Sequence, residues 1–146
     1  MVGIFIYTGK IAGKHRPRVR RDGWTYPDPN DVEYQQAIAA AYESQCGLWF
    51  GTNPVSVTID IVRSMPKDRP RRIDKEPDMF KPDVDNVAKA VLDALNGVAF
   101  ADDRQVVALT VRKHPRERVE NESMRIVVAT VPSDMIYNSQ LKGGHE

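Results

Sequence analysis

The sequence has very few of the residues that build disulfides and zinc sites. Cys46 is the only cysteine, and none of the three histidines (His15, His114 and His145) is paired with another at ligand spacing. A single thiol excludes an internal disulfide and a zinc site with several cysteine ligands. Any metal chemistry must therefore rest on carboxylates, and such hard oxygen ligands favour Mg²⁺ or Mn²⁺.

A long apolar run is also missing. No stretch of about 18 apolar residues is present, which excludes a transmembrane helix of ordinary length. Residues 1–7 are mostly apolar and a basic segment follows them, which is the reverse of the order in a signal peptide. We therefore expect a cytoplasmic protein without a membrane partner. The length of 146 residues and the hydrophobic fraction of 41% predict one domain with one core.

The formal net charge of +1 conceals a strong separation of charges along the chain. Residues 10–21 contain six lysines and arginines and no acid, and residues 67–72 form a second basic patch. Acidic residues gather between Glu76 and Asp103. This pattern predicts that a polyanion binds the basic segments while the acids hold divalent cations between protein and phosphate.

Hydrophobic periodicity predicts the order strand-helix-strand-helix-strand-strand. Helical spacing indicates one helix from Asn30 or Asp31 to Gly47 and a second over residues 84–96, with Asp83 as its N-cap. The strands are expected at residues 4–8, 55–62, 106–112 and 124–131. The fold class is α/β (α+β): a mixed sheet with helices packed on it, in a single domain at residues 1–132. For the tail, residues 133–146, we expect partial disorder.

Two long segments have no regular period and are expected to be loops. Residues 9–30 are rich in glycine, proline and arginine, with a short hairpin predicted at Asp22-Gly23. We expect Trp24 and Tyr26 to anchor this segment, and stacking on an exposed base is the alternative. The second loop, residues 63–81, is polar, basic and proline-bearing.

Acidic residues flank the second predicted helix. Asp83 and Asp85 stand at its start, and Asp102 and Asp103 follow its end. The helix is about 20 Å long and the five residues after it reach at most about 17 Å, so the two pairs converge only marginally within one chain. Three or four aspartates that do converge supply the ligands for two hard cations. Lys89 lies on the same helix face as Asp85, where it can orient water or stabilise charge on a phosphate.

Spacing alone favours a simpler interpretation of these residues. Asp83 can cap the helix, Asp85 can favour its positive end, and Lys89 can pair with Asp85. The Asp102-Asp103 pair is then an ordinary turn, and the basic runs are solvated faces.

A longer pattern around the aspartates resembles the RusA family of Holliday junction resolvases. The family pattern D-x-D-N-x-x-K at a helix start, then L-D-A-L, matches residues 83–95, and a D-D pair followed by a polar residue and glutamine matches residues 102–105. Residues 14–18 are similar to the basic K-x-R-P-R segment of the family, and the match extends over about residues 4–131.

The resemblance implies a structure-selective endonuclease. Family members are small homodimers of bacteria, phages and prophages that cut four-way DNA junctions symmetrically in recombination and repair. They use Mg²⁺ or Mn²⁺, with two ions expected per site, and leave a 5′-phosphate and a 3′-hydroxyl. The catalytic residues correspond to Asp83, Asp85, Lys89 and Asp103, and the metal ligands to Asp83, Asp85, Asp103 and the adjacent Asp102.

Branched DNA is then the expected partner of the basic segments. We expect its backbone to contact the following residues: Lys14, Arg16, Arg18, Arg20, Arg69, Arg71 and Arg72. One alternative is a non-catalytic protein that binds branched or single-stranded DNA, with steep salt dependence and no nicking. A weaker alternative is a phosphotransferase with a metal at Asp83-x-Asp85, which no glycine-rich phosphate loop supports.

Overall fold

Strand β4 (Val55–Val62) lies inside the central sheet, and its apolar residues occupy alternate positions, so that they share one buried face. The computed structural model describes residues 1–132, and the tail, for which partial disorder was expected, lies outside them. β4 pairs with β8 (Ser123–Thr130), and β8 pairs with β1 (Val2–Thr8), both antiparallel. β6 (Val106–Lys113) lies parallel to β4, which gives the order β1-β8-β4-β6. The predicted mixed sheet is confirmed.

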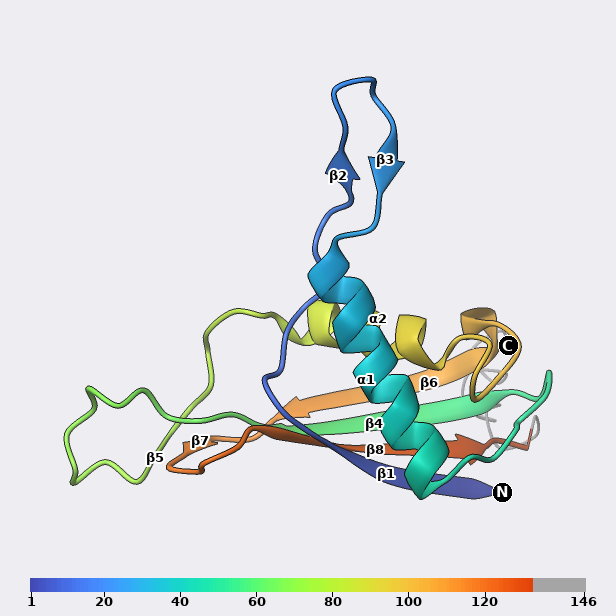
Figure 1. Cartoon of the computed structure of the whole chain (residues 1–146). Coiled ribbons are helices and arrows are strands. Elements are labelled where there is room, and N and C mark those ends of the chain that lie inside the picture. The colour runs from blue at the N-terminus through green and yellow to red at the C-terminus, as the bar shows by residue number, and fades with distance from the viewer. Residues whose placement is uncertain (133–146) are drawn as a thin grey trace, which may run out of the picture.

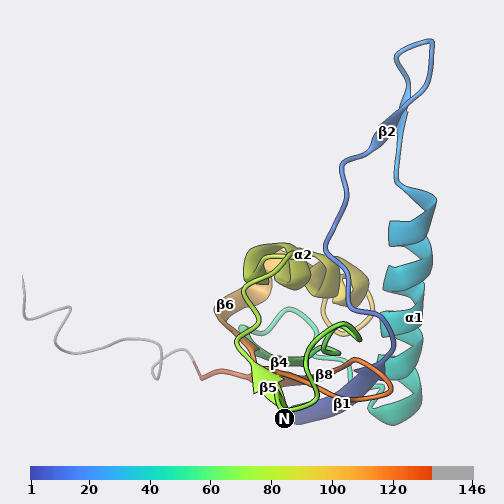
Figure 2. The same ribbon diagram turned by 90° about the vertical axis from the view of Figure 1, so that its left-hand side faces the viewer.

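Two helices cover one face of this sheet. Helix α1 (Pro29–Gln45) lies against β1, and helix α2 (Val84–Leu95) lies against β6 and α1 (Figures 1 and 2). Burial of the helix and sheet faces forms a single core, as expected for the predicted fold class. Its largest fully buried side chains include the following residues: Phe5, Ile38, Tyr42, Ile59, Leu95, Phe100 and Ile126. Among residues 1–132, neither helix is long and apolar enough to cross a membrane.

Short elements extend from this framework. β2 (Arg18–Val19) and β3 (Thr25–Tyr26) form the predicted hairpin, which projects away from the body beyond the start of α1 (Figures 1 and 2). β5 (Lys75–Glu76) pairs with β7 (Arg116–Glu117), so the segment 63–81 is partly ordered as a strand. The 3₁₀ helix η1 (Asp103–Gln105) precedes β6.

Three local predictions are corrected by the structure. The N-cap of α1 is Asp28 and not Asn30 or Asp31, because its side chain accepts a hydrogen bond from the backbone N–H of Asn30 and Pro29 suits the first helical position. The apolar spacing that predicts the second helix places Val84 on its buried face, but Val84 is exposed because it lies in the first turn of α2, before the helix reaches the core. The expected anchoring role of Trp24 is also wrong: the residue is 66% exposed on the hairpin, where no core lies within reach.

An ion-pair cluster occupies the sheet face away from the helices. Asp60 accepts hydrogen bonds from Arg112 Nε at 2.7 Å, and its carboxylate lies 2.8 Å from His114 Nε2. The Arg112 guanidinium, and then His114, lower the pKa of Asp60 from 3.8 to about 2. A pKa depressed by folding stabilises the protein above pH 4, and this contribution disappears as the pH falls to about 2.

We expect Asp60→Asn to reduce the free energy of unfolding by about 1 kcal/mol at pH 7, after allowance for solvent screening. The variant should also lose less stability between pH 4 and pH 2 than the unmodified protein, because the titrating carboxylate is gone. Urea unfolding across this pH range measures both effects, with Asp74→Asn at an exposed position as the control. An unchanged acid-side slope in Asp60→Asn would contradict this assignment.

Candidate active site

Helix α2 presents Asp83 and Asp85 at its N-terminal end. Asp83 has the extended backbone of an N-cap residue, but its side chain makes no capping hydrogen bond. Capping therefore does not explain this carboxylate, which is exposed and available to a ligand. Asp85 and Lys89 are also exposed, one helical turn apart.

Asp102 and Asp103 lie beyond the other end of α2. Asp102 caps η1 by accepting a hydrogen bond from the backbone N–H of Arg104 at 2.9 Å, and Gln105 Oε1 accepts one from the Asp102 backbone N–H at 2.8 Å. Contact with Asp102 raises the pKa of Asp103, while the Arg104 backbone N–H lowers that of Asp102. Asp93 adds a further negative charge near Asp103. This crowding of carboxylates suits a bound cation, which would relieve the repulsion.

The two acidic pairs remain at opposite ends of α2 within one chain. After η1, β6 runs back beneath α2, and Lys113 at its end donates hydrogen bonds to the carbonyl oxygens of Pro82 at 2.9 Å and Phe80 at 2.6 Å. The far end of β6 therefore lies at the start of α2, and η1 lies at its end. The helix has 12 residues and spans about 18 Å. A single chain thus keeps the two acidic pairs (hereafter the candidate half-sites) apart and does not bring the four aspartates together.

The basic segment lies directly against α2. A Cβ atom on Gly13 would lie 3.0 Å from Cβ of both Pro82 and Asn86, so glycine permits this close approach. The next residue, Lys14, places its Nζ 2.6 Å from Asp93 Oδ2. An open cavity of about 590 Å³ lies between the segment and the start of α2. Its lining includes one acid and four cationic side chains: Asp83, Lys10, Lys14, Arg63 and Lys81.

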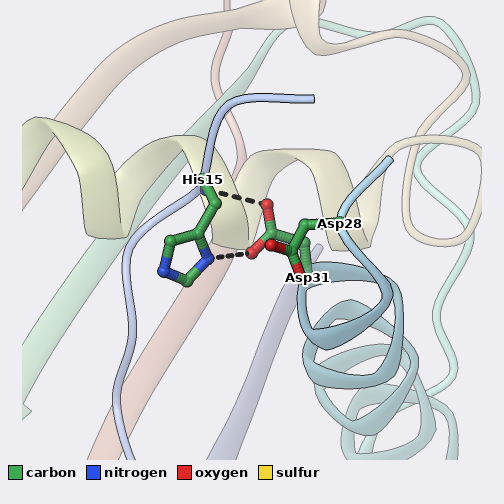
Figure 3. Close-up of side chains that lie close together, drawn as sticks. All are labelled: His15, Asp28 and Asp31. Carbon is green, nitrogen blue, oxygen red and sulfur yellow. Dashed lines mark hydrogen bonds and ion pairs between the residues drawn. The ribbon is translucent and has the colours of Figure 1, made fainter. Parts of the chain in front are cut away.

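His15 and Asp31 hold the root of the projecting hairpin (Figure 3). The Asp31 carboxylate lies 2.6 Å from His15 Nδ1 and accepts a hydrogen bond from the His15 backbone N–H at 2.7 Å. Asp28 lies beside them, and the three residues form a group of metal-ligand types. Asp28 is already engaged by the α1 cap and by Arg18 Nε at 3.3 Å. These contacts explain the group as an anchor between the basic segment and α1.

The other predicted DNA-binding residues occupy two separate projections. Arg16, Arg18 and Arg20 are exposed on or near the hairpin, where Arg20 Nη2 lies 3.3 Å from Asp22. Arg71 and Arg72 are exposed in the segment 63–81, which extends from another side of the body (Figure 1). In the same segment, Arg69 pairs with Glu76 at 3.0 Å, so it helps to hold the loop.

Sequence reasoning missed two residues next to the basic segment. Asp93 follows Asp85 by two helical turns and binds Lys14, and this periodicity was a signal for it. Arg63 directly follows β4, is buried, and places Nη1 3.2 Å from Asp78 Oδ1. Its Nε is buried, lies 4.0 Å from Glu122 Oε2 and has no hydrogen-bond partner among residues 1–132, and no pattern in the sequence indicated this burial.

Comparison with known proteins gives two findings. Residues 8–129 match the family described as endodeoxyribonuclease RusA. The chain is also similar to a protein of Bacillus subtilis (strain 168) named uncharacterized protein YqaN, with 33% identity over 131 residues. That alignment covers 82% of this chain and 92% of the Bacillus protein.

Proposed function

Because the chain belongs to the RusA family of endodeoxyribonucleases, we propose that it resolves four-way DNA junctions by metal-dependent phosphodiester hydrolysis. The observation that carries the proposal is the uncapped carboxylate of Asp83 at the rim of a cavity lined by lysines and an arginine. Helix capping does not explain a cavity lined by cationic side chains beside Asp83. Such a cavity fits a phosphate backbone that is bound next to metal-binding acids.

The aspartates fit a pair of hard cations. Asp83 and Asp85 would supply ligands from one end of α2, and Asp103 with Asp102 from the other end. The neighbouring Asp102 carboxylate, which raises the pKa of Asp103, supports this assignment, because a bound cation would offset the repulsion between the two acids. When bound, Mg²⁺ or Mn²⁺ would activate water and neutralise charge on the phosphate.

The remaining side chains position the DNA and assist the reaction. Water adds to phosphorus, the bond from phosphorus to O3′ breaks, and the products carry a 5′-phosphate and a 3′-hydroxyl. Lys89 lies one turn from Asp85 and would stabilise negative charge on the phosphate. Lys14, Arg16, Arg18, Arg20, Arg71 and Arg72 would hold the junction backbone.

We also propose that the active protein is a homodimer whose sites are completed between subunits. One chain keeps its acidic pairs at opposite ends of α2, too far apart for two cations about 4 Å from each other. Two α2 helices packed antiparallel about a two-fold axis would bring Asp85 of one subunit to Asp103 of the other. β6 is an edge strand, and the exposed Val84, Val107 and Leu109 offer apolar area on this side.

The proposed function is tested with a synthetic four-way junction and a linear duplex of matched sequence, with and without Mg²⁺. We expect paired, symmetric nicks in the junction only, and only with the metal. Equal cleavage of the duplex would contradict selectivity for branched DNA. Tight binding with no nicking in either Mg²⁺ or Mn²⁺ would favour the non-catalytic DNA-binding protein.

A further inference from the structure

The hairpin that projects beyond α1, residues 17–27 (hereafter the arm), has one face of alternating cations and aromatic rings. In its register Arg18 lies opposite Tyr26, and Val19 opposite Thr25. The backbone N–H of Arg20 donates to the carbonyl of Trp24 at 2.8 Å, which continues the pairing. Directly opposite residues of antiparallel strands share a face, and successive pairs alternate. The following four residues therefore share a face, with Val19 and Thr25 on the other: Arg18, Arg20, Trp24 and Tyr26.

The turn at the tip fixes the backbone of Trp24 while its indole remains in solvent. The Trp24 backbone N–H donates to Asp22 Oδ1 at 3.0 Å, and the Gly23 N–H donates to the Arg20 carbonyl at 3.0 Å. Gly23 has a φ of 85°, which glycine adopts without strain. The indole is 66% exposed, although its burial would be favourable. The arm thus holds a large apolar ring in place without covering it.

The positive charge around the Trp24 ring indicates what kind of partner binds the arm. Residues 14–21 contain five lysines and arginines and no acid. The ion pairs of Arg20 with Asp22 and of Arg18 with Asp28 involve exposed arginines, and such pairs contribute little. A polyanion with flat apolar groups can pair with the arginines and stack on the aromatic rings. Nucleic acid has both features, because it carries phosphates and bases. A second copy of this chain that docked through its own arm would bring the same positive charge to the contact.

The root of the arm places it beside the candidate active site. His15 is held to Asp31, and the preceding Lys14 binds Asp93 of α2. From this root the six residues from Pro17 to Asp22, which are joined by five steps along the strand, extend the chain by about 16 Å. DNA cleaved at α2 therefore lies within reach of Trp24.

We propose that the arm stacks Trp24 on a base at the branch point of the DNA while Arg18 and Arg20 contact the flanking phosphates. An open branch point interrupts continuous base stacking, so it offers a free base face that the interior of a linear duplex lacks. The proposal rests on the proposed function for its substrate, but the stacking itself does not require cleavage.

The chain contains only two tryptophans, which allows a direct test. Trp49 follows the far end of α1, about 25 Å from the root of the arm, and is also exposed. In Trp49→Phe, fluorescence reports Trp24 alone, and in Trp24→Phe it reports Trp49 alone. With EDTA to prevent cleavage, we expect a four-way junction to quench the emission of Trp49→Phe by half or more. A linear duplex should quench it much less, and the emission of Trp24→Phe should change little.

Affinity gives a second measurement. Trp24→Ala should weaken junction binding by about 10-fold, as expected for the loss of one stacked base. Val19→Ala removes an equally exposed apolar side chain from the opposite face of the arm and should leave the affinity unchanged.

Anisotropy of a labelled junction, recorded in the same samples, measures binding independently of the Trp24 emission and so distinguishes the possible outcomes. Binding without quenching of Trp24 would overturn the proposal, as would equal quenching by the duplex. A change in Trp24 emission with protein concentration alone would show that a second copy covers the arm instead. Quenching by a junction that is never cut in Mg²⁺ would support the arm and contradict the endonuclease. Absence of any junction binding would overturn both.

Discussion

Replacing Asp85 with asparagine is expected to reduce junction cleavage by about a thousandfold or more while leaving junction affinity nearly unchanged. Asp85 is exposed in the first turn of α2 and, with Asp83, forms the candidate half-site at this end of the helix. An asparagine has nearly the same shape but no charge, so it binds a hard divalent cation far less well. The loss of about 4 kcal/mol of charge stabilisation in the transition state corresponds to the stated factor.

The affinity should persist because the DNA is held by other residues. The basic segment contacts α2 through Gly13 and Lys14 and does not depend on Asp85. Removing a negative charge beside a phosphate also reduces repulsion. Single-turnover cleavage of a labelled junction in Mg²⁺ and anisotropy in EDTA measure the two quantities separately.

Glu43→Gln is the matched control, because it removes one exposed carboxylate from α1 far from both half-sites. This variant should cut at the rate of the unmodified protein. Rapid cleavage by Asp85→Asn in Mg²⁺ would show that the carboxylate is not part of the reaction. An equal loss of affinity and rate would assign Asp85 to DNA binding instead.

The elements with strong periodicity could be predicted from the sequence. Alternation in β4 gave its bounds, and the apolar spacing of α2 together with Asp83 gave the start of that helix. These patterns are local, because burial of one face determines both the period and the register. The start of α1 was less accessible, since Asp28, Asn30 and Asp31 are all plausible caps and only the backbone shows which one bonds.

Contacts between distant segments could not be predicted in the same way. Nothing in the sequence relates His15 to Asp31 or Lys14 to Asp93, because each pair forms only when the basic segment folds back over α1 and α2. The fate of Trp24 was inferred from the usual burial of tryptophan, and this inference failed because the residue lies on a projection without a core. The failure is informative, since the exposed aromatic ring among arginines is the observation on which the proposed stacking rests.

The aspartates combine both cases. Their residue types and order were sufficient to identify a candidate site. The length of the predicted helix between the two pairs already indicated that they converge only marginally within one chain. Only the return of β6 beneath the helix, with Lys113 bound to Pro82, shows that the two pairs stay apart in one chain. Because the pairs are separated, the nicking activity of dimers that combine two different variants can test how the subunits are arranged.

A heterodimer of one Asp85→Asn subunit and one Asp103→Asn subunit is expected to nick the junction at about half the rate of the unmodified protein. The homodimer of either variant should be inactive. If each site combines Asp85 of one subunit with Asp103 of the other, both substitutions fall in one site of the heterodimer. The other site then contains only native aspartates. Co-expression with two different affinity tags gives the heterodimer, and the nicking rate of a labelled junction gives its activity.

The control is a heterodimer of Asp83→Asn and Asp85→Asn subunits. These residues belong to the same end of α2, so every site retains one substitution and no activity should return. Sedimentation must show that each preparation is dimeric, and a monomeric unmodified protein would contradict the proposed assembly. If the first heterodimer is folded and dimeric but remains inactive, Asp85 and Asp103 do not meet between subunits. Recovery in the first heterodimer alone would show that each site takes Asp85 and Asp103 from different subunits, because a site built within one subunit stays inactive in both heterodimers.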